Sequence, residues 1–271
     1  MNYQLMAVDM DGTLLNSKKA ISPGDAQALN RALDLGKTVI FCTGRCLGEL
    51  RDFFPLFPKM RYVLCESGAM IFDLHDRQAI HRQSFDPETV ATIRSRTEKL
   101  DLMPQLLMDG DAVMNRADVN NLAHFHMEQY QQHFTRCGVT VPSVWERWAA
   151  SGVSVDKICL YHTSPEARAE TRRLLDDLNV VMADTEATSL EISPLGVDKG
   201  NGLRLLCRHL SIPLEQTIAV GDSDNDLSVL RTAGLSVAMA NASEHVRGTC
   251  AVMVADNDHC GVLEAVERFL L

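Results

Sequence analysis

Short, mainly apolar runs alternate with helix-like segments in the first and the last third of this 271-residue chain. The runs lie at residues 3–8, 38–42, 62–65, 217–220, 235–239 and 250–254. A run such as "TVIFC" (38–42) has no polar face, which is typical of a strand buried on both sides. Strands that alternate with helices form a parallel sheet covered by helices on both faces. The sequence therefore predicts an α/β fold with a doubly wound parallel sheet.

Helix signals stand between these runs. Ser22 can cap a helix that has Pro23 at its first position, and Gly36 ends that helix. Further helices are predicted at residues 200–210, 225–233 and 262–270.

The middle of the chain is less regular. It contains predicted helices at 87–100 and 165–178 and a predicted strand at 157–162. Residues suited to chemistry thin out here and resume near Lys199. We interpret this segment as an inserted α/β cap domain. The predicted domains are a cap of residues 84–187 and a core of residues 1–83 with 188–271.

The composition limits the classes of function. The chain is 46% hydrophobic and carries a net charge of −10, whereas a protein that binds nucleic acid needs a basic face. No stretch reaches the roughly 20 apolar residues of a membrane span, and we find no secretory signal. The eight cysteines are spread singly, which is typical of reduced thiols. We expect a cytoplasmic protein without nucleic-acid or membrane partners.

Polar side chains follow three of the predicted strands. Asp9 and Asp11 follow the first run, Thr43 and Gly44 follow the second, and "GDSDND" (221–226) follows another. In an open α/β sheet, ligands bind outside the carboxyl ends of the strands. One edge of the sheet would therefore hold a hydroxyl, exposed backbone amides and several carboxylates.

This crowding of carboxylates predicts a cation. Neighbouring carboxylates repel one another, so one pKa rises unless a cation lies among them. The evident ligands are oxygen donors, which favours a hard ion and Mg²⁺ first. If the extended chain continues through Asp9 and Asp11, their side chains point the same way. Both carboxylates can then face one bound group.

Four motifs resemble those of the haloacid dehalogenase superfamily. "DMDGTL" (9–14) matches the first motif, Thr43 in "CTGR" the second, Lys199 in "GVDKGNGL" the third and "GDSDND" the fourth. The inserted segment falls between the second and the third motif. This placement is similar to that in the Cof-type phosphatases of subclass IIB, which carry a large α/β cap there. The resemblance implies a Rossmann-like core.

The resemblance also implies catalytic roles. Asp9 would be the nucleophile that forms an aspartyl phosphate. Asp11 would protonate the leaving oxygen and then take a proton from the hydrolytic water. Mg²⁺ would be held by Asp9, Asp222 and the backbone carbonyl of Asp11.

The same resemblance assigns residues to the phosphoryl group. Its oxygens would be held by Thr43, the backbone amides of Met10 and Gly44, Asn225 and Lys199. Lys199 would also offset the negative charge of Asp9 and the phosphate. Asp226 would orient metal-bound waters or Lys199.

The segment "ESGA" departs from the family pattern. Many relatives have N-G-A after the third strand, whereas Ser67 precedes Gly68 here. We expect the fold to be unaffected, because the turn-forming glycine is present.

The sequence thus predicts Mg²⁺-dependent hydrolysis of small phosphomonoesters, with sugar phosphates or related metabolites as substrates. The cap would close over the substrate and set specificity. One alternative is a phosphotransferase or phosphomutase on the same site. Another is a regulator that binds a phosphometabolite without turnover, which the intact Asp9, Asp11, Lys199 and Asp222 disfavour. A small phosphorylated metabolite is the expected partner, and the sequence does not indicate the oligomeric state.

Overall fold

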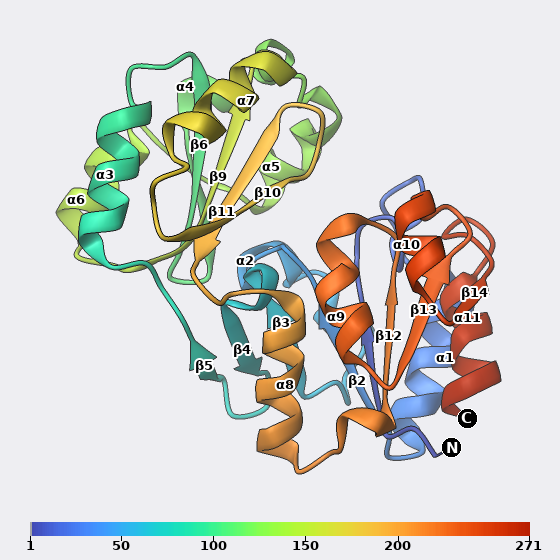
Figure 1. The fold of residues 1–271 in the computed structure, drawn as a ribbon. Coiled ribbons are helices and arrows are strands. Elements are labelled where there is room, and N and C mark those ends of the chain that lie inside the picture. The colour runs from blue at the N-terminus through green and yellow to red at the C-terminus, as the bar shows by residue number, and fades with distance from the viewer. Residues whose placement is uncertain (1) are drawn as a thin grey trace. The chain divides into compact units, whose positions relative to one another are not determined.

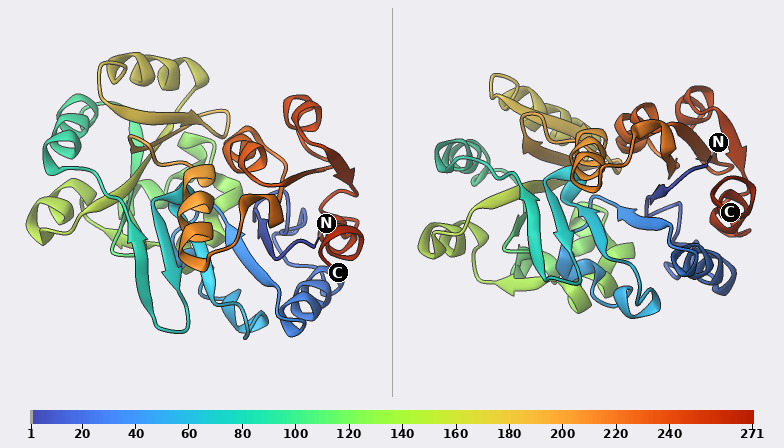
Figure 2. Two further views of the ribbon diagram at one scale, coloured as in Figure 1. Left: turned by 60° about the horizontal axis from the view of Figure 1, so that its bottom comes forward. Right: turned by 90° about the horizontal axis from the view of Figure 1, so that it is seen from below.

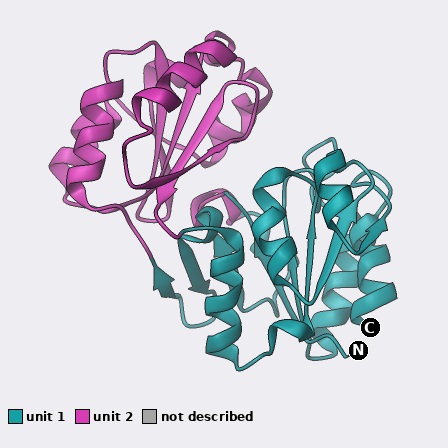
Figure 3. Cartoon of the chain, viewed as in Figure 1, with its two compact units in different colours: residues 1–44, 52–82, 197–271 teal, residues 45–51, 83–196 magenta. Residues whose placement is uncertain are grey.

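The computed structural model of the protein describes residues 2–271 (Figure 1). The chain divides into two compact units, shown in different colours in Figure 3. Unit 1 consists of Met1–Gly44, Asp52–Arg82 and Val197–Leu271, and unit 2 consists of Arg45–Arg51 and Gln83–Gly196.

Unit 1 contains an eight-stranded sheet in the order β14-β13-β12-β1-β2-β3-β4-β5. Its strands are β1 (Leu5–Val8), β2 (Thr38–Cys42), β3 (Tyr62–Cys65), β4 (Met70–Asp73), β5 (Gln78–Arg82), β12 (Thr217–Gly221), β13 (Leu235–Met239) and β14 (Val252–Val254). The strands from β14 to β3 pair in parallel, and β4 and β5 add an antiparallel edge. The predicted parallel α/β core is confirmed.

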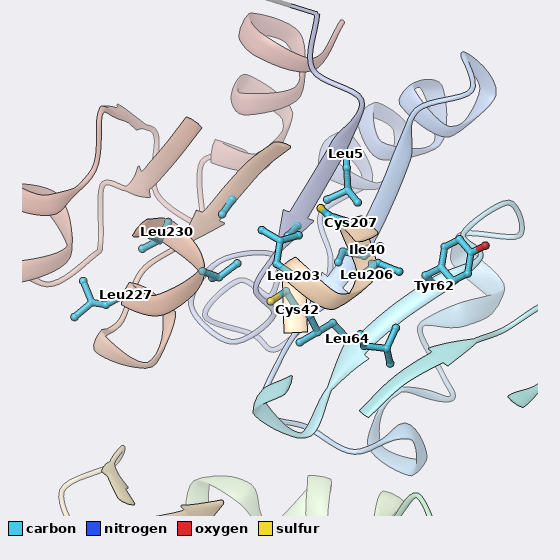
Figure 4. Close-up of a cluster of buried hydrophobic side chains, with 14 of the residues drawn as sticks. Leu5, Ile40, Cys42, Tyr62, Leu64, Leu203, Leu206, Cys207, Leu227 and Leu230 are labelled. Atoms are coloured by element: carbon cyan, nitrogen blue, oxygen red, sulfur yellow. The ribbon is translucent and has the colours of Figure 1, made fainter. Parts of the chain in front are cut away.

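Helices cover both faces of this sheet, as the two views of Figure 2 show. The helices are α1 (Pro23–Asp34), α8 (Lys199–Leu210), α9 (Leu227–Thr232), α10 (Glu244–Thr249) and α11 (Gly261–Ala265). Helices α1 and α11 pack together on one side. On the other side α8 buries Leu203 and Leu206 against Leu5, Ile40 and Leu64 of the strands (Figure 4). Burial of these aliphatic side chains stabilises the layered arrangement.

The ends of α1 follow the predicted capping signals. Ser22 Oγ accepts a hydrogen bond from the Asp25 amide at 3.0 Å and begins α1. Gly36, with a φ of 81°, follows the end of that helix. Asp198 begins α8 in the same way, because its Oδ1 accepts a hydrogen bond from the Asn201 amide at 2.8 Å.

Several predicted elements differ in extent from those observed. The first strand covers only Leu5–Val8 of the predicted run 3–8. The predicted helix 225–233 consists of a 3₁₀ turn, Asp224–Asp226, followed by α9. The closing helix continues from α11 into a π-helical turn, Val266–Leu270.

Unit 2 contains a six-stranded sheet in the order β10-β11-β9-β6-β7-β8. Its strands are β6 (Leu102–Met108), β7 (Asp111–Asn115), β8 (Val139–Val141), β9 (Val155–His162), β10 (Val180–Asp184) and β11 (Ser189–Pro194). All pairs are antiparallel except β7 with β8. The unit also contains α2 (Leu47–Leu50), α3 (Pro87–Thr97), α4 (Arg116–Val119), α5 (Gln131–Cys137), α6 (Val144–Ser151) and α7 (Pro165–Leu174).

The two units divide the chain differently from the sequence-based domains. The core was predicted to resume at residue 188. In the structure, β11 (189–194) pairs with β9 and β10 in the sheet of unit 2. Unit 2 therefore extends to Gly196. It also takes in Arg45–Arg51, whose Cys46 packs with Leu107 and Ala112.

Among residues 2–271, no helix combines the length and the apolar character that crossing a bilayer requires.

Candidate active site

Asp9 lies at the carboxyl end of β1, between β12 and β2 in the sheet. Its backbone amide donates to the carbonyl of Val220 at 3.0 Å, so the parallel pairing with β12 extends to this residue. The chain then turns at Gly12, which has a φ of 80°. A Cβ atom on Gly12 would lie 2.3 Å from Asp222 Oδ2. Glycine is therefore required both by the backbone and by the close approach of Asp222.

Lys199, the first residue of α8, joins two carboxylates. Its Nζ donates to Asp9 Oδ1 and to Asp226 Oδ1, each at 2.6 Å. The Lys199 side chain is 1% exposed. Burial alone would lower the pKa of Lys199, but the charges of Asp226 and Asp9 raise it well above its ordinary value. Lys199 is therefore a fixed ammonium ion between two acids.

Asp226 uses both of its carboxylate oxygens within the site. Oδ1 accepts the hydrogen bond from Lys199, and Oδ2 accepts from the backbone amides of Asp222 and Ser223 at 3.1 and 3.2 Å. The side chain is completely buried. Asp226 thus fixes the loop after β12 and the position of the Lys199 ammonium at the same time.

Asp222 lies beside these residues and is only partly buried. Its Oδ1 accepts a hydrogen bond from Thr13 Oγ1 at 2.8 Å. Burial, followed by the charge of Asp226, raises the pKa of Asp222 to about 6. Burial and the neighbouring carboxylate thus both disfavour the charged form of Asp222.

The acidic cluster fits a hard divalent cation. Asp9, Asp222 and Asp226 each offer one carboxylate oxygen, and these oxygens lie within 4.8 Å of one another. The pKa of Asp222 is raised first by burial and then by the charge of Asp226, and a bound cation would offset both effects. Oxygen donors of this kind suit Mg²⁺. Because both oxygens of Asp226 accept hydrogen bonds, Asp9 and Asp222 are the better placed ligands.

Asp11 and Asn225 make contacts of their own. Lys19 Nζ donates to Asp11 Oδ1 at 3.1 Å, and 37% of the Asp11 side chain is exposed. Asn225 lies in the 3₁₀ turn after β12, where its Oδ1 accepts from Ser223 Oγ at 2.7 Å. The side chain of Met10 is buried, which leaves its backbone as the group that can meet a ligand.

The loop after β2 is tied to the turn after β3. The Ser67 amide donates to the carbonyl of Thr43 at 3.0 Å. Ser67 has a φ of 58°, in the left-handed region that asparagine adopts more readily than serine. A Cβ atom on Gly68 would lie 2.2 Å from the carbonyl oxygen of Asp198. This turn therefore packs directly on the residue that caps α8.

Some of the predicted site residues contact one another directly, and others only follow neighbouring strands of the sheet. Direct hydrogen bonds connect Asp9, Lys199, Asp226 and the backbone of Asp222. Thr43 and Gly44 follow β2, the strand that pairs with β1. Asp11 is bound by Lys19, a residue that was not predicted to contribute to the site.

Two residues that follow β13 also contribute to the site, although they were not predicted to do so. Asn241 Nδ2 donates to the carbonyl of Gly12 at 2.8 Å. The Ser243 amide donates to the carbonyl of Asp222 at 3.1 Å. Both contacts hold the two acidic loops in place. The rule that ligand-binding loops follow the carboxyl ends of strands could have identified this segment.

Comparisons with known proteins agree with this geometry. A sequence profile of the haloacid dehalogenase-like hydrolases matches residues 6–266. The chain is 27% identical to the phosphatase YwpJ of Bacillus subtilis (strain 168), over 98% of this chain and 100% of that protein. It is 24% identical to the 5-amino-6-(5-phospho-D-ribitylamino)uracil phosphatase YcsE of the same organism, over 100% of this chain and 97% of that protein.

A solved structure is similar over nearly the whole chain. The structure of a haloacid dehalogenase-like hydrolase from B. subtilis has a TM-score of 0.87 and 25% sequence identity, and the match covers 98% of this chain and 99% of that one. The resemblance inferred from the four motifs is therefore confirmed. The chain belongs to the haloacid dehalogenase-like hydrolases and is an enzyme of their phosphatase group.

Proposed function

We propose that this hydrolase removes phosphate from small phosphomonoesters, with sugar phosphates among its substrates, and that Mg²⁺ is its cofactor. The observation that carries the proposal is the Lys199 ammonium between Asp9 and Asp226, with Asp222 beside them. A carboxylate that is held next to fixed positive charge can receive an anionic phosphoryl group.

Asp9 is the proposed nucleophile, and Asp11 is the proposed acid and base. Asp9 attacks phosphorus and forms an aspartyl phosphate as the bond to the alcohol oxygen breaks. Asp11 gives its proton to that oxygen and then takes one from the water that hydrolyses the aspartyl phosphate. The 37% exposure of the Asp11 side chain supports this role, because an entering ester can approach it from the solvent.

The remaining residues are proposed to hold the charged groups. Asp9, Asp222 and the backbone carbonyl of Asp11 would hold Mg²⁺, which when bound supplies positive charge opposite the phosphoryl oxygens. Asp226 positions Lys199. The groups proposed to hold the phosphoryl oxygens are Lys199, Thr43, Asn225 and the backbone amides of Met10 and Gly44.

Unit 2 is the proposed cap that selects the alcohol part of the substrate. One relative is named for its action on 5-amino-6-(5-phospho-D-ribitylamino)uracil, a small phosphorylated molecule. We infer a substrate of comparable size and no nucleic-acid partner, in keeping with the net charge of −10. The free cysteines support a place in the cytoplasm.

The test is phosphate release from a panel of phosphate esters, measured with Mg²⁺ and with EDTA. We expect Asp9→Asn to lower kcat by about a thousandfold or more, because the nucleophile is lost while the shape of the side chain is kept. Asp34→Asn, at an exposed residue of the same unit, is the control and should behave as the wild type.

Release that continues in EDTA would contradict the role of Mg²⁺. Substantial turnover by pure Asp9→Asn would contradict the aspartyl phosphate.

A further inference from the structure

The turn Glu66–Gly68, between β3 and β4, has an unusual backbone. Glu66, Ser67 and Gly68 have φ angles of 55°, 58° and 103°, so three successive residues lie in the left-handed region. This region is unfavourable for residues that carry a Cβ atom. Such strain persists only where contacts with the rest of the fold outweigh it, and it is concentrated at functional sites.

One contact of this turn is with the loop after β2. The Ser67 amide donates to the carbonyl of Thr43 at 3.0 Å, and the Thr43 amide donates to the carbonyl of Leu64 at 2.9 Å. Thr43 itself is buried. The backbone of Thr43 is thus held at its amide by β3 and at its carbonyl by the turn that follows β3.

The other contact is with the first turn of α8. A Cβ atom on Gly68 would lie 2.2 Å from the carbonyl oxygen of Asp198 and 3.3 Å from the amide nitrogen of Lys199. A Cβ atom on Gly202 would lie 3.2 Å from the Cα atom of Gly68. The two backbones are therefore in direct contact. A displacement of the turn would be passed on to the residue that carries the buried ammonium.

We propose that Ser67 and Gly68 are positioning residues of the phosphatase reaction. Their turn bonds to Thr43 and packs against Lys199, two of the groups that are proposed to hold the phosphoryl oxygens. It therefore fixes the separation of these two groups without itself having to touch the substrate. Donors that are fixed before the phosphoryl group arrives stabilise the transition state without reorganisation. This inference rests on the proposed phosphatase activity, and all of its residues belong to unit 1.

The first test compares Gly68→Ala with Gly36→Ala. Both glycines have a positive φ, of 103° and 81°, so alanine is strained at either position. Only the Cβ atom on Gly68 would meet α8. Among residues 2–271, a Cβ atom on Gly36 would have no neighbour within 4 Å apart from its chain neighbours.

Gly68→Ala should lower kcat/KM for the best substrate of the ester panel by roughly 10- to 100-fold, because misplacing reacting groups by about 1 Å has an effect of this size. Gly36→Ala should keep the wild-type kcat/KM.

A second pair of variants keeps the test valid if Gly68→Ala folds poorly. Ser67→Val adds strain without adding an atom to Gly68, because a β-branched residue rarely adopts a positive φ. Ser211→Val is the matched control. Ser211 has a φ of 56° and follows α8 at the opposite end from Lys199.

Asparagine completes the series, because it adopts the left-handed region more readily than serine. At residue 67, kcat/KM should fall in the order Asn, Ser, Val. At residue 211, kcat/KM should not depend on the side chain. The unfolding temperature should fall in the order Asn, Ser, Val at both positions.

Binding of inorganic phosphate gives a readout that does not require turnover. Calorimetry in the presence of Mg²⁺ measures its Kd. Gly68→Ala and Ser67→Val should raise the Kd by about tenfold, because hydrogen bonds to a charged group are weakened. Gly36→Ala and Ser211→Val should keep the wild-type Kd. A purely structural role of the turn would lower the unfolding temperature without changing the Kd of the folded protein.

The outcomes separate the two proposals. Wild-type Kd and kcat/KM in folded Gly68→Ala or Ser67→Val would overturn the positioning role, as would equal losses in the two controls. Absence of phosphate release from every ester would overturn the phosphatase proposal, and the Kd comparison would still test the turn. A wild type that neither releases nor binds phosphate would overturn both.

Discussion

Lys199 is the residue on which the charge balance of the candidate site depends. It contacts Asp9 and Asp226, and all three side chains are nearly inaccessible to solvent. Removal of one member of a buried ion pair leaves uncompensated charge, which costs far more than the loss of an exposed pair. Stability and activity therefore depend on the same ammonium group.

We expect Lys199→Met to lower the free energy of unfolding by about 3–5 kcal/mol, because two buried carboxylates lose their counter-ion. Urea unfolding at pH 8 without added metal measures this change. Lys59→Met is the control, since Lys59 and Asp34 form a pair that is 63% and 61% exposed. That variant should change stability by less than about 1 kcal/mol. Equal losses in both variants would contradict the structural role of Lys199.

At the scale of single elements, the start of α8 connects stability to the site. Asp198 caps the helix, and the next residue is Lys199. We expect Asp198→Ala to lower stability by about 1 kcal/mol and also to lower kcat, because the first turn no longer holds the lysine in place.

Ser164→Ala is the matched control for this substitution, because Ser164 caps α7 in unit 2 by accepting from the Ala167 amide at 3.2 Å. Thermal unfolding should show a similar loss of stability, while kcat stays at the wild-type value. A fall in kcat with Ser164→Ala would mean that loss of stability alone explains the effect.

Helix α2 carries a carboxylate whose contacts make stability depend on pH. Burial would raise the pKa of Glu49, but the hydrogen bond and charge of His133, with the Cys46 amide and Arg45, bring it below 4.5. A carboxyl group whose pKa is lowered in the folded state stabilises the protein at pH values above the pKa that the group has in the unfolded state. This stabilisation is lost as the pH falls through the folded pKa.

The stability difference between the wild type and Glu49→Gln should therefore shrink as the pH falls from about 6 to below 4.5. Unfolding by urea across this range measures the difference. The exposed Glu88→Gln in the same unit serves as the control. A difference that grows on acidification would contradict the assigned contacts.

Some elements could not be predicted from local patterns. The edge strands β4 and β5 were not predicted, and β5 is mostly half-exposed or exposed. Their stability as strands comes from antiparallel pairing with β3 and with each other. It was also not predicted that the segment of α2 belongs to unit 2, because Cys46, the residue before α2, packs on Leu107 and Ala112, which lie far away in the sequence.

At the scale of the whole molecule, the acidic cluster links metal binding to stability. A ligand that binds only the folded state stabilises it by about 2.7 kcal/mol at 100 times its Kd. Mg²⁺ should therefore raise the unfolding temperature of the wild type but not that of Asp222→Asn. The increase should weaken below about pH 6, because protons compete for Asp222.

Asp34 is exposed, pairs with Lys59 and is not part of the acidic cluster. Asp34→Asn should therefore respond to Mg²⁺ as the wild type does. Equal stabilisation of Asp222→Asn would mean that the ion binds elsewhere.

The parallel core and the positions where its strands end could be predicted from local sequence patterns. Buried strands have a local signature, and the motifs follow them within a few residues, so Asp9, Thr43 and Asp222 could be placed from the printed chain. Two features could not be predicted in this way. The division of the chain at residue 196 depends on strand pairing, and the contacts of Asp11 and Asn225 depend on loop geometry.

The contacts between these side chains depend on how the layers of unit 1 pack together. Lys199 is 190 residues from Asp9 along the chain, and their 2.6 Å contact exists because α8 packs over the centre of the sheet. The same packing sets Asp226 on the other side of the ammonium. Sequence patterns record which residues follow each strand, whereas the balance of buried charge arises only when the layers pack together.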